Sequence, residues 1–257
     1  MLMALDVGNT NIVIALYEGD ALRRSWRMST DKNRSGDEMG MTLLSFLQAE
    51  QVQPEKINDV IISSVVPPIM HSLSNAVRRY LNCEPIVIGP GVKTGLNIRY
   101  DNPREVGADR IVNAVAAVKK YGVPIIIVDF GTATTYCAVD RKGDYIGGVI
   151  TPGVQISLDA LFERAAKLPR VEIIKPDTLI GRNTVSAMQA GAVYGQVGQV
   201  DYIVNRMRKE LSEPNCRVIA TGGLAKLIAP ETETIQDVDS MLTLDGLKII
   251  YDKNKED

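Results

Sequence analysis

The chain carries one short pattern twice: an apolar run that ends in an aspartate, followed by any residue, a glycine and small polar residues. The first copy is Leu5-Asp6-Val7-Gly8-Asn9-Thr10 and the second is Val128-Asp129-Phe130-Gly131-Thr132. The apolar run before Asp129 is too short for a helix and predicts a buried strand, while the glycine favours a tight turn. Two copies predict a duplicated α/β fold in which equivalent strands each deliver a carboxylate into a polar turn.

The elements expected along the chain repeat in nearly the same order. In the first half, strands are predicted over residues 2–6, 11–18, 22–28, 60–66 and 85–88, and helices over 36–49 and 69–80. In the second half, strands are predicted over 125–129, 135–139, 145–150, 217–221 and 235–238, and helices over 154–167, 184–211, 224–228 and 240–251. A further helix over 111–121 separates the halves. These patterns predict two lobes, residues 1–117 and 118–257.

Composition narrows the class of protein. The length of 257 residues suits one large domain or two ordinary ones, and the net charge of −2 argues against nucleic acid as the main partner. Three well-separated cysteines indicate neither a disulfide framework nor a zinc site, and the single His71 cannot build a histidine-ligated metal centre. No apolar run approaches membrane-spanning length, so we expect a cytoplasmic protein without a membrane partner.

The turn after Asp6 suits phosphate. Backbone N–H groups of Gly8–Asn11 can surround phosphate oxygens, and Asn9, Thr10 and Asn11 add side-chain donors. Asp6 could hold Mg²⁺ through water, since this ion keeps much of its hydration and takes only one or two carboxylates. The alternative is a plain hairpin turn. If the halves pack symmetrically, Asp6 and Asp129 face one another across a cleft, where two carboxylates need cations beside them.

Two further motifs carry candidate chemistry. Gly107-Ala108-Asp109-Arg110 lies at a predicted helix start, which favours anions. Asp109 could accept or orient the proton of a substrate hydroxyl, and Arg110 could hold an anionic group; capping with a surface ion pair is the alternative. Thr221-Gly222-Gly223 follows a strand, where glycine would let a base or ribose approach the backbone, unless it is an ordinary strand–helix turn.

Two segments lack a clear element or a usual composition. Residues 89–106 are rich in glycine and proline and are expected to form an ordered surface loop. The long helix predicted over 184–211 contains Gly191, Gly195 and Gly198, which lower helix propensity and suggest a close-packed neighbour or a ligand. The charged tail from Asp252 is expected to fray.

Taken together, these motifs resemble one family. Asp6–Asn11, Gly107–Arg110, Asp129–Thr135, Gly147–Gly153 and Thr221–Gly223 stand in the order found in type III pantothenate kinases, and the likeness covers nearly the whole chain except its tail. These kinases belong to the superfamily of acetate and sugar kinases, actin and heat-shock chaperone ATPase domains. The resemblance implies a duplicated ribonuclease H-like (actin-like ATPase) fold. Each lobe would hold a mixed five-stranded sheet flanked by helices.

The resemblance also implies an activity and its residues. The activity is ATP-dependent phosphorylation of pantothenate to 4′-phosphopantothenate, the first step of coenzyme A synthesis, with Asp109 as proton acceptor. The residues implied for ATP are Asp6, Val7, Gly8, Asn9, Thr10, Asn11, Ile12, Val13 and Thr132. Those implied for pantothenate are Tyr100, Gly107, Ala108, Asp109, Arg110 and Thr184. Mg²⁺ would accompany ATP, with Asp6 beside it, and Asp129 would bind a monovalent cation, K⁺ or NH₄⁺.

The family forms homodimers with shared substrate sites, so Thr184 is a candidate for a residue donated by the partner, and the glycine-bearing helix 184–211 for the interface. Three other functions stay open at this point. They are an ATP-binding module that works by lobe closure, a kinase of another small alcohol or acid, and a regulatory protein like the relatives described as accessory factors in transcription. The glycine-rich segment beside Gly107–Arg110 disfavours the first, because such a module needs no acceptor pocket.

Overall fold

The computed structural model describes residues 1–255 and divides the chain into two compact units. Met1–Gly95, Asn102–Ala116 and the residues from Thr243 onward form the first unit, and Leu96–Asp101 with Ala117–Leu242 forms the second. Helix α3 (Ala108–Tyr121) therefore begins in one unit and ends in the other. The last helix of the chain, α7 (Leu242–Lys255), belongs almost entirely to the first unit. The lobes predicted at residues 1–117 and 118–257 stay a prediction.

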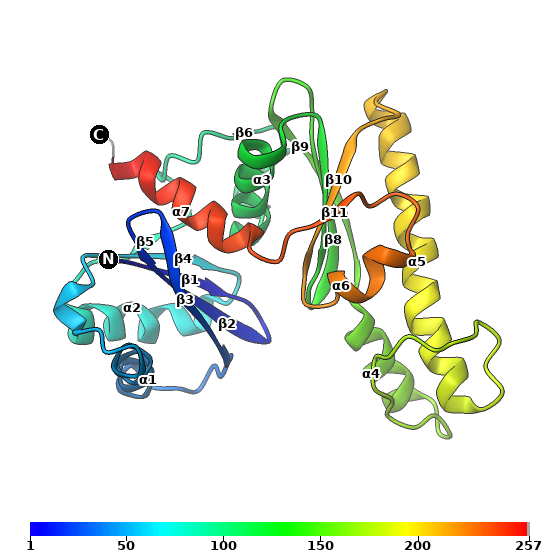
Figure 1. The fold of residues 1–257 in the computed structure, drawn as a ribbon, viewed down its shortest axis with the longest axis horizontal. Helices are drawn as coiled ribbons and strands as arrows, with labels where there is room; N and C mark the ends of the chain where they lie inside the picture. The colour runs from blue at the N-terminus through cyan, green and yellow to red at the C-terminus, as the bar shows by residue number, and fades with distance from the viewer. Residues whose placement is uncertain (256–257) are drawn as a thin grey trace. The chain divides into compact units, whose positions relative to one another are not determined.

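The first unit is built on a mixed five-stranded sheet in the order β3-β2-β1-β4-β5. Strands β1, β2 and β3 form an antiparallel meander, and β4 and β5 extend it in parallel from β1 (Figure 1). The strand bounds are β1 Leu2–Val7, β2 Asn11–Glu18, β3 Ala21–Ser29, β4 Asp59–Ser64 and β5 Ile86–Val87. The helices of this half are α1 Gly36–Ala49 and α2 Pro67–Leu81, with 3₁₀ turns at Pro54–Lys56 and Pro103–Glu105.

The second unit repeats this sheet and adds one strand, in the order β11-β10-β7-β8-β9-β6. The strand bounds are β6 Asn97–Ile98, β7 Ile125–Phe130, β8 Ala133–Val139, β9 Asp144–Pro152, β10 Arg217–Gly222 and β11 Asp237–Val238. The helices are α4 Val154–Arg164, α5 Thr184–Leu211 and α6 Ala225–Ile228, followed by a 3₁₀ turn at Ala229–Glu231. The segment 89–106, predicted as an ordered surface loop, also contains the short strand β6, which was not predicted because two residues leave no periodic pattern.

The duplication extends to single residues. Strands β1 and β7 share one burial pattern, in which the aspartate is the single partly exposed position of the six. Asp6 lies opposite Ser63 on the parallel neighbour β4, and Asp129 lies opposite Thr221 on the parallel neighbour β10. The predicted duplicated α/β fold is confirmed, and the two aspartates occupy equivalent positions.

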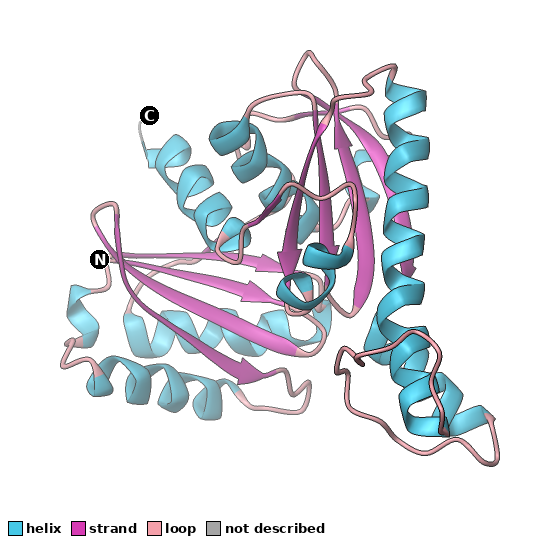
Figure 2. Ribbon diagram, turned by 45° about the vertical axis from the view of Figure 1, so that its right-hand side comes forward, coloured by secondary structure: helices cyan, strands magenta, loops and turns pink. Residues whose placement is uncertain are grey.

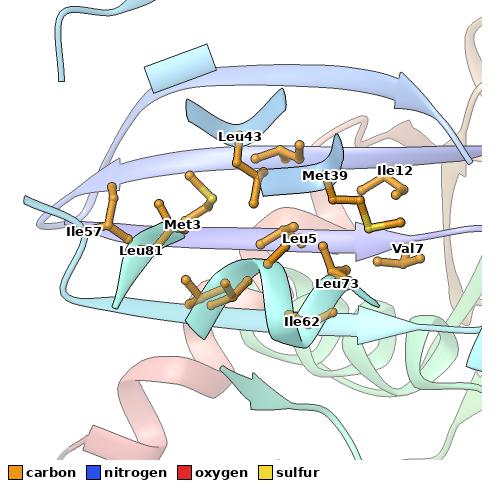
Figure 3. Packing of buried hydrophobic residues seen from close by; sticks show 14 of the residues in the cluster. Met3, Leu5, Val7, Ile12, Met39, Leu43, Ile57, Ile62, Leu73 and Leu81 are labelled. Carbon is orange, nitrogen blue, oxygen red and sulfur yellow. The ribbon is translucent and has the colours of Figure 1, made fainter. Parts of the chain in front are cut away.

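Helices α1 and α2 lie side by side on one face of the first sheet (Figure 2). Their apolar stripes and the alternate residues of β1, β2 and β4 form the core of this unit, as Figure 3 shows for Leu5, Leu43 and Leu73. Each of these buried leucines contributes roughly 1.5–3 kcal/mol to folding. Because this core takes Leu5 and Ile62 from β1 and β4, the alternate residues Asp6 and Ser63 project from the opposite face.

Local chemistry explains where α1 starts and how closely it packs. The Ser35 hydroxyl accepts a hydrogen bond from the Glu38 N–H at 3.2 Å, and the Glu38 carboxylate accepts one from the Ser35 N–H at 2.8 Å. This reciprocal capping satisfies two helix-end donors. Further along, a Cβ at Gly40 would lie 2.1 Å from the Tyr80 ring of α2. Gly40 therefore allows α1 to approach α2 closely.

The helix α7 continues further than the sequence predicts. Tyr251 donates a hydrogen bond to the Asp59 carboxylate at 2.7 Å, and Lys255 forms an ion pair with the same carboxylate. A Cβ at Gly246 would lie 2.2 Å from the Val112 carbonyl oxygen of α3, so α7 also packs closely on α3. The prediction of a tail frayed from Asp252 is wrong as far as Lys255, because these contacts hold the last turns; residues 256–257 lie outside the described chain.

The core of the second unit lies between its sheet and α5. Alternate residues of β7, β8 and β10 meet Val193, Val200 and Val204 of that helix. Helix α4 packs separately on the N-terminal part of α5, through Leu158 and Met188. Asn183 caps α5 by accepting a hydrogen bond from the Ser186 N–H at 2.9 Å.

Candidate active site

The turn between β1 and β2 is held by its own hydrogen bonds. The Gly8 N–H donates to the Asn11 carbonyl at 3.0 Å, and the Thr30 hydroxyl donates to the Gly8 carbonyl at 2.6 Å. The Gly8 N–H is therefore used inside the turn, so a phosphate would have to be held by other groups. Asn9 and Thr10 are exposed at its tip. The predicted ATP residues Val7, Ile12 and Val13 form the strand ends that carry the turn.

Asp109 is placed beside this turn by helix α3. A Cβ at Gly107 would lie 2.5 Å from the Asp109 carboxylate and 3.6 Å from Val65. The Val65 N–H in turn donates to the Val7 carbonyl at 3.1 Å. Gly107, Ala108 and Asp109 thus lie at the same edge of the sheet as the Asp6 turn, all within the first unit.

The surroundings of Asp109 change its proton affinity. Burial raises the pKa of this carboxyl above its usual value, because the charged form loses water. The hydrogen bond that the Arg110 N–H donates to Asp109 Oδ1 at 2.8 Å, together with the nearby guanidinium, offsets the increase only partly. A carboxylate with a raised pKa is a stronger base than an exposed aspartate.

Arg110 is buried, with 6 % of its surface exposed. A buried guanidinium needs acceptors or anions near it, because an isolated buried charge is costly. The alternative of a surface ion pair for Asp109-Arg110 is therefore wrong. The fork geometry of arginine suits a carboxylate or phosphate.

Asp129 is enclosed by glycines. A Cβ at Gly222 would lie 2.5 Å from Asp129 Oδ1, and one at Gly131 would lie 3.6 Å from it. Gly222 also has φ +93°, a conformation that other residues rarely adopt. Glycine at position 222 of the Thr221-Gly222-Gly223 motif thus leaves space for the Asp129 carboxylate. The sequence alone does not reveal this contact.

Thr132 lies in the exposed turn between β7 and β8, where the N-terminus of α4 meets it. A Cβ at Gly153 would lie 2.3 Å from the Thr132 carbonyl oxygen and 2.7 Å from the Gly131 carbonyl oxygen. Only glycine allows α4 to begin so close to this turn. The Gly131–Thr132 turn is therefore supported from behind by helix α4.

Tyr100 lies over strand β9 in the second unit. Its ring is 3.7 Å from the position of a Cβ at Gly147, which has φ +131°, and its centroid is 6.5 Å from that of Tyr145. The absence of a side chain at Gly147 leaves space for the ring. Packing of the Tyr100 ring and the positive φ angle thus explain why glycine stands at position 147 of the Gly147–Gly153 motif.

Thr184 is the first residue of α5 and lines a cavity of about 810 Å³. The cavity lies between α4, the chain before α5, and the N-terminal half of α5, where Gly191 and Gly195 also line it. A Cβ at Gly191, Gly195 or Gly198 would meet no atom within 4 Å. The sequence predicts a close-packed neighbour or a ligand for these glycines, and the described residues of this chain supply no such neighbour.

The donor set fits cations that keep water. Asp6 and Asp129 are oxygen donors at strand ends, and among residues 1–255 no three histidine, cysteine, aspartate or glutamate side chains come together as a metal cluster. A cation at either aspartate would take most ligands from water and phosphate, which suits Mg²⁺ at Asp6. Asp129, closed in by glycine backbone, suits a cation that accepts carbonyl oxygens.

A model of the type III pantothenate kinase family matches residues 2–206, which is most of the chain and includes every residue predicted to bind ATP, pantothenate or a cation. The chain belongs to the type III pantothenate kinase family. It is a phosphotransferase that uses ATP to phosphorylate pantothenate in the first step of coenzyme A synthesis. This match favours pantothenate phosphorylation over the alternatives of an ATP-binding module and of a kinase for another acceptor.

Solved structures agree on the fold of this pantothenate kinase. A protein described as a Baf family transcriptional activator from Campylobacter jejuni has 18 % identity and a TM-score of 0.59, with 99 % of each chain covered. A 2-dehydro-3-deoxygalactonokinase-like protein from Sinorhizobium meliloti has 12 % identity and a TM-score of 0.61, covering 98 % of this chain and 96 % of the other. MreB 5 of Spiroplasma citri has 12 % identity and a TM-score of 0.56, covering 99 % and 97 %. At these identities they establish the actin-like fold alone.

Some functional features of the kinase are not visible in its sequence. The buried hydroxyl of Ser63 beside Asp6 and the contact of Gly153 with the Thr132 turn both depend on strand register and helix placement. Strand pairing of Asp6 with a serine could be found only by aligning β4 against β10, where Thr221 takes the same place. In the described part of the chain, no helix is both long and apolar enough to cross a membrane.

Proposed function

We propose that Asp109 accepts the proton of the pantothenate hydroxyl while the γ-phosphoryl group of ATP is transferred to that oxygen. The hydroxyl oxygen forms a bond to phosphorus, the bond to the ADP oxygen breaks, and the proton passes to the Asp109 carboxylate. The observation that supports this role is the contact chain from Asp109 through Gly107 and Val65 to Val7, which puts a base of raised pKa at the edge where the Asp6 turn begins. Phosphoryl transfer depends mostly on such positioning and charge.

The same arrangement of the two equivalent aspartates supports the residues proposed to bind the nucleotide and the cations. The residues from Asp6 to Val13 bind the ATP phosphates, Thr132 adds a contact to the nucleotide, and Asp6 would hold Mg²⁺ through water. Asp129 binds a monovalent cation, K⁺ or NH₄⁺. Support comes from the equivalent strand-end positions of the two aspartates and from their oxygen donors. Cations offset the negative charge of the phosphates and of the two carboxylates.

Pantothenate is bound by Tyr100, Gly107, Ala108, Arg110 and Thr184. Its carboxylate calls for a cation, which the buried Arg110 guanidinium provides. Its apolar gem-dimethyl group suits an aromatic ring, and Tyr100 presents one over Gly147. Asp109 then contacts the hydroxyl that is phosphorylated.

The protein acts as a homodimer in the cytoplasm. The surface around α4 and α5 exposes apolar side chains and the cavity beside the α5 glycines, which is typical of an interface. Large exposed members of this surface are Ile156, Leu161, Phe162, Leu179, Ile180, Val185 and Tyr202. No disulfide links Cys83, Cys137 and Cys216, as is usual in a reducing compartment.

One experiment tests the role of Asp109. In a coupled assay with ATP, a potassium salt and pantothenate, Asp109→Asn should lower kcat roughly 10²–10⁴-fold, the usual contribution of an acid–base group. Asp37→Asn is the matched control, because Asp37 is the second residue of α1 as Asp109 is of α3, but is exposed. Near-normal turnover of Asp109→Asn would exclude the role. Sugars and acetate serve as acceptor controls.

A further inference from the structure

Ser63 is a fully buried serine whose hydroxyl has no hydrogen-bond partner among residues 1–255. It lies near the end of β4 with 0 % of its surface exposed, and its Oγ is one of the few buried side-chain atoms left unsatisfied in the described chain. The next residue shows the contrast, because the Ser64 hydroxyl accepts a hydrogen bond from the Val66 N–H at 3.1 Å. A buried hydroxyl without a partner costs free energy, and alanine in its place would not.

The position of Ser63 relates this hydroxyl to the Asp6 carboxylate. The two residues are direct partners in the parallel pairing of β1 and β4, so their side chains project from the same face of the sheet. That face is opposite to the core formed by α1 and α2, because Leu5 and Ile62, one residue earlier, belong to this core. Ser63 is therefore the side-chain hydroxyl beside Asp6 on the neighbouring strand.

The second unit repeats the pair. Thr221 lies opposite Asp129 in the parallel pairing of β7 and β10, and 3 % of its surface is exposed. Each copy of the fold thus places a buried hydroxyl residue next to its strand-end aspartate. The two sites share this pairing although the flanking residues Ile62 and Ala220, and likewise Ser64 and Gly222, differ between β4 and β10.

We infer that Ser63 is a positioning residue for Asp6: when a magnesium nucleotide is bound, its hydroxyl donates a hydrogen bond to the Asp6 carboxylate and fixes the orientation in which that group meets the hydrated cation. The inference rests on the proposed role of Asp6 toward Mg²⁺. It gives a role to the buried Ser63 hydroxyl, for which the described residues supply no hydrogen-bond partner. A hydrogen bond to an ionised acceptor is among the stronger ones.

Calorimetric binding of the ATP analogue AMPPNP, with and without Mg²⁺, tests the inference without measuring activity. Ser63→Ala should weaken binding of Mg-AMPPNP about 10-fold, as expected for the loss of one hydrogen bond to a charged group, and should leave binding of metal-free AMPPNP unchanged. Ser63→Thr should restore the affinity, because Thr221 shows that the equivalent position accepts threonine. The melting temperature of nucleotide-free Ser63→Ala should equal or exceed that of the wild type.

A double-mutant cycle separates this inference from the proposed function. Asp6→Asn should by itself reduce the gain in affinity that Mg²⁺ gives, and Ser63→Ala should then add nothing. If Asp6→Asn has this effect but Ser63→Ala does not, the role of Ser63 is wrong and that of Asp6 stands. If Asp6→Asn leaves the Mg²⁺ effect intact, both roles are wrong. Equal weakening with and without Mg²⁺ would also exclude the positioning role.

Thr134→Val is the matched control for the removal of a buried hydroxyl. The Thr134 hydroxyl is likewise buried without a partner, but its residue pairs with Phe130, on the α5 side of the second sheet. This variant should leave the Mg²⁺ dependence of AMPPNP binding at the wild-type value. A loss of that dependence in Thr134→Val would show that any buried hydroxyl has the effect, which would overturn a specific role for Ser63.

Discussion

At the scale of single residues, burial of Asp109 affects both the pKa of its carboxyl group and the free energy of folding. Its pKa is raised, mainly because the charged form is desolvated. A raised folded-state pKa means that ionisation disfavours folding at pH above that value, whereas below the unfolded-state pKa the group is neutral in both states. The proposed base Asp109 is thus expected to destabilise the enzyme at neutral pH.

Asp109→Asn should therefore raise the melting temperature at pH 7, because the amide keeps the acceptor for the Arg110 N–H without a buried charge. The difference from the wild type should shrink as pH falls to about 4, where the model-compound pKa of aspartate lies. Thermal unfolding at several pH values measures it. The same difference at every pH would contradict this reason, and Asp37→Asn should show no such gain.

The same raised pKa predicts the acid limb of the pH–rate profile. The value of kcat/KM should fall on acidification with an apparent pKa above the usual range of an exposed aspartate, since protonated Asp109 cannot accept the hydroxyl proton. Steady-state kinetics between pH 4 and about 8 provide the measurement. An acid limb at or below the ordinary aspartate value would show that Asp109 does not control it.

At the scale of elements, close approach of α4 to the Gly131–Thr132 turn is the feature most open to test. Gly153→Ala should destabilise the protein by about 1–3 kcal/mol, the usual cost of overpacking, because the new methyl group would meet two carbonyl oxygens. It should also weaken ATP binding if Thr132 contacts the nucleotide. Denaturant unfolding and calorimetry measure the two effects.

The control at this scale is Gly198→Ala in α5. A Cβ there meets no atom within 4 Å, so the change should stabilise the helix by about 0.5–1 kcal/mol. If both alanine variants behave alike, contact with the turn is not what requires glycine at position 153.

At the scale of the whole molecule, the open glycine face of α5 bears on assembly. Gly191→Leu should leave a folded chain, because the side chain has space, but should shift the proposed dimer toward monomer, as bulk at the interface prevents close approach. Analytical ultracentrifugation gives the oligomeric state. Asn205→Leu, on the same helix and outside the cavity, is the control. An unchanged dimer would place the interface elsewhere.

Subunit mixing tests whether Thr184 contributes to the site of the other chain in the proposed dimer. Asp109→Asn and Thr184→Ala chains are unfolded together and refolded as mixed dimers. If Thr184 completes the partner's site, one site in each mixed dimer has both residues intact, and about a quarter of wild-type activity should return, given two-fold symmetry and random pairing. Activity no higher than the average of the two parents would place both residues in the same chain's site.

The sequence alone determines the duplicated fold and names the candidate residues of the site. Short apolar runs before Asp6 and Asp129 predict buried strands because the burial of a strand depends on local pattern. The helix over residues 184–211 is predicted for the same reason. The order of the motifs is enough for the family, since those residues are read directly.

Only the tertiary structure decides how deeply these residues are buried and which groups they contact. Three properties depend on which elements pack together: the desolvation of Asp109, the burial of Arg110 and the open space beside the α5 glycines. Contacts between residues far apart in the sequence leave no periodic signal, so the sequence does not predict these properties. The helical end of the chain was not predictable for the same reason, because Asp59 is nearly two hundred residues away from Tyr251. Likewise, the inference about Ser63 depends on the strand register, which pairs Ser63 with Asp6.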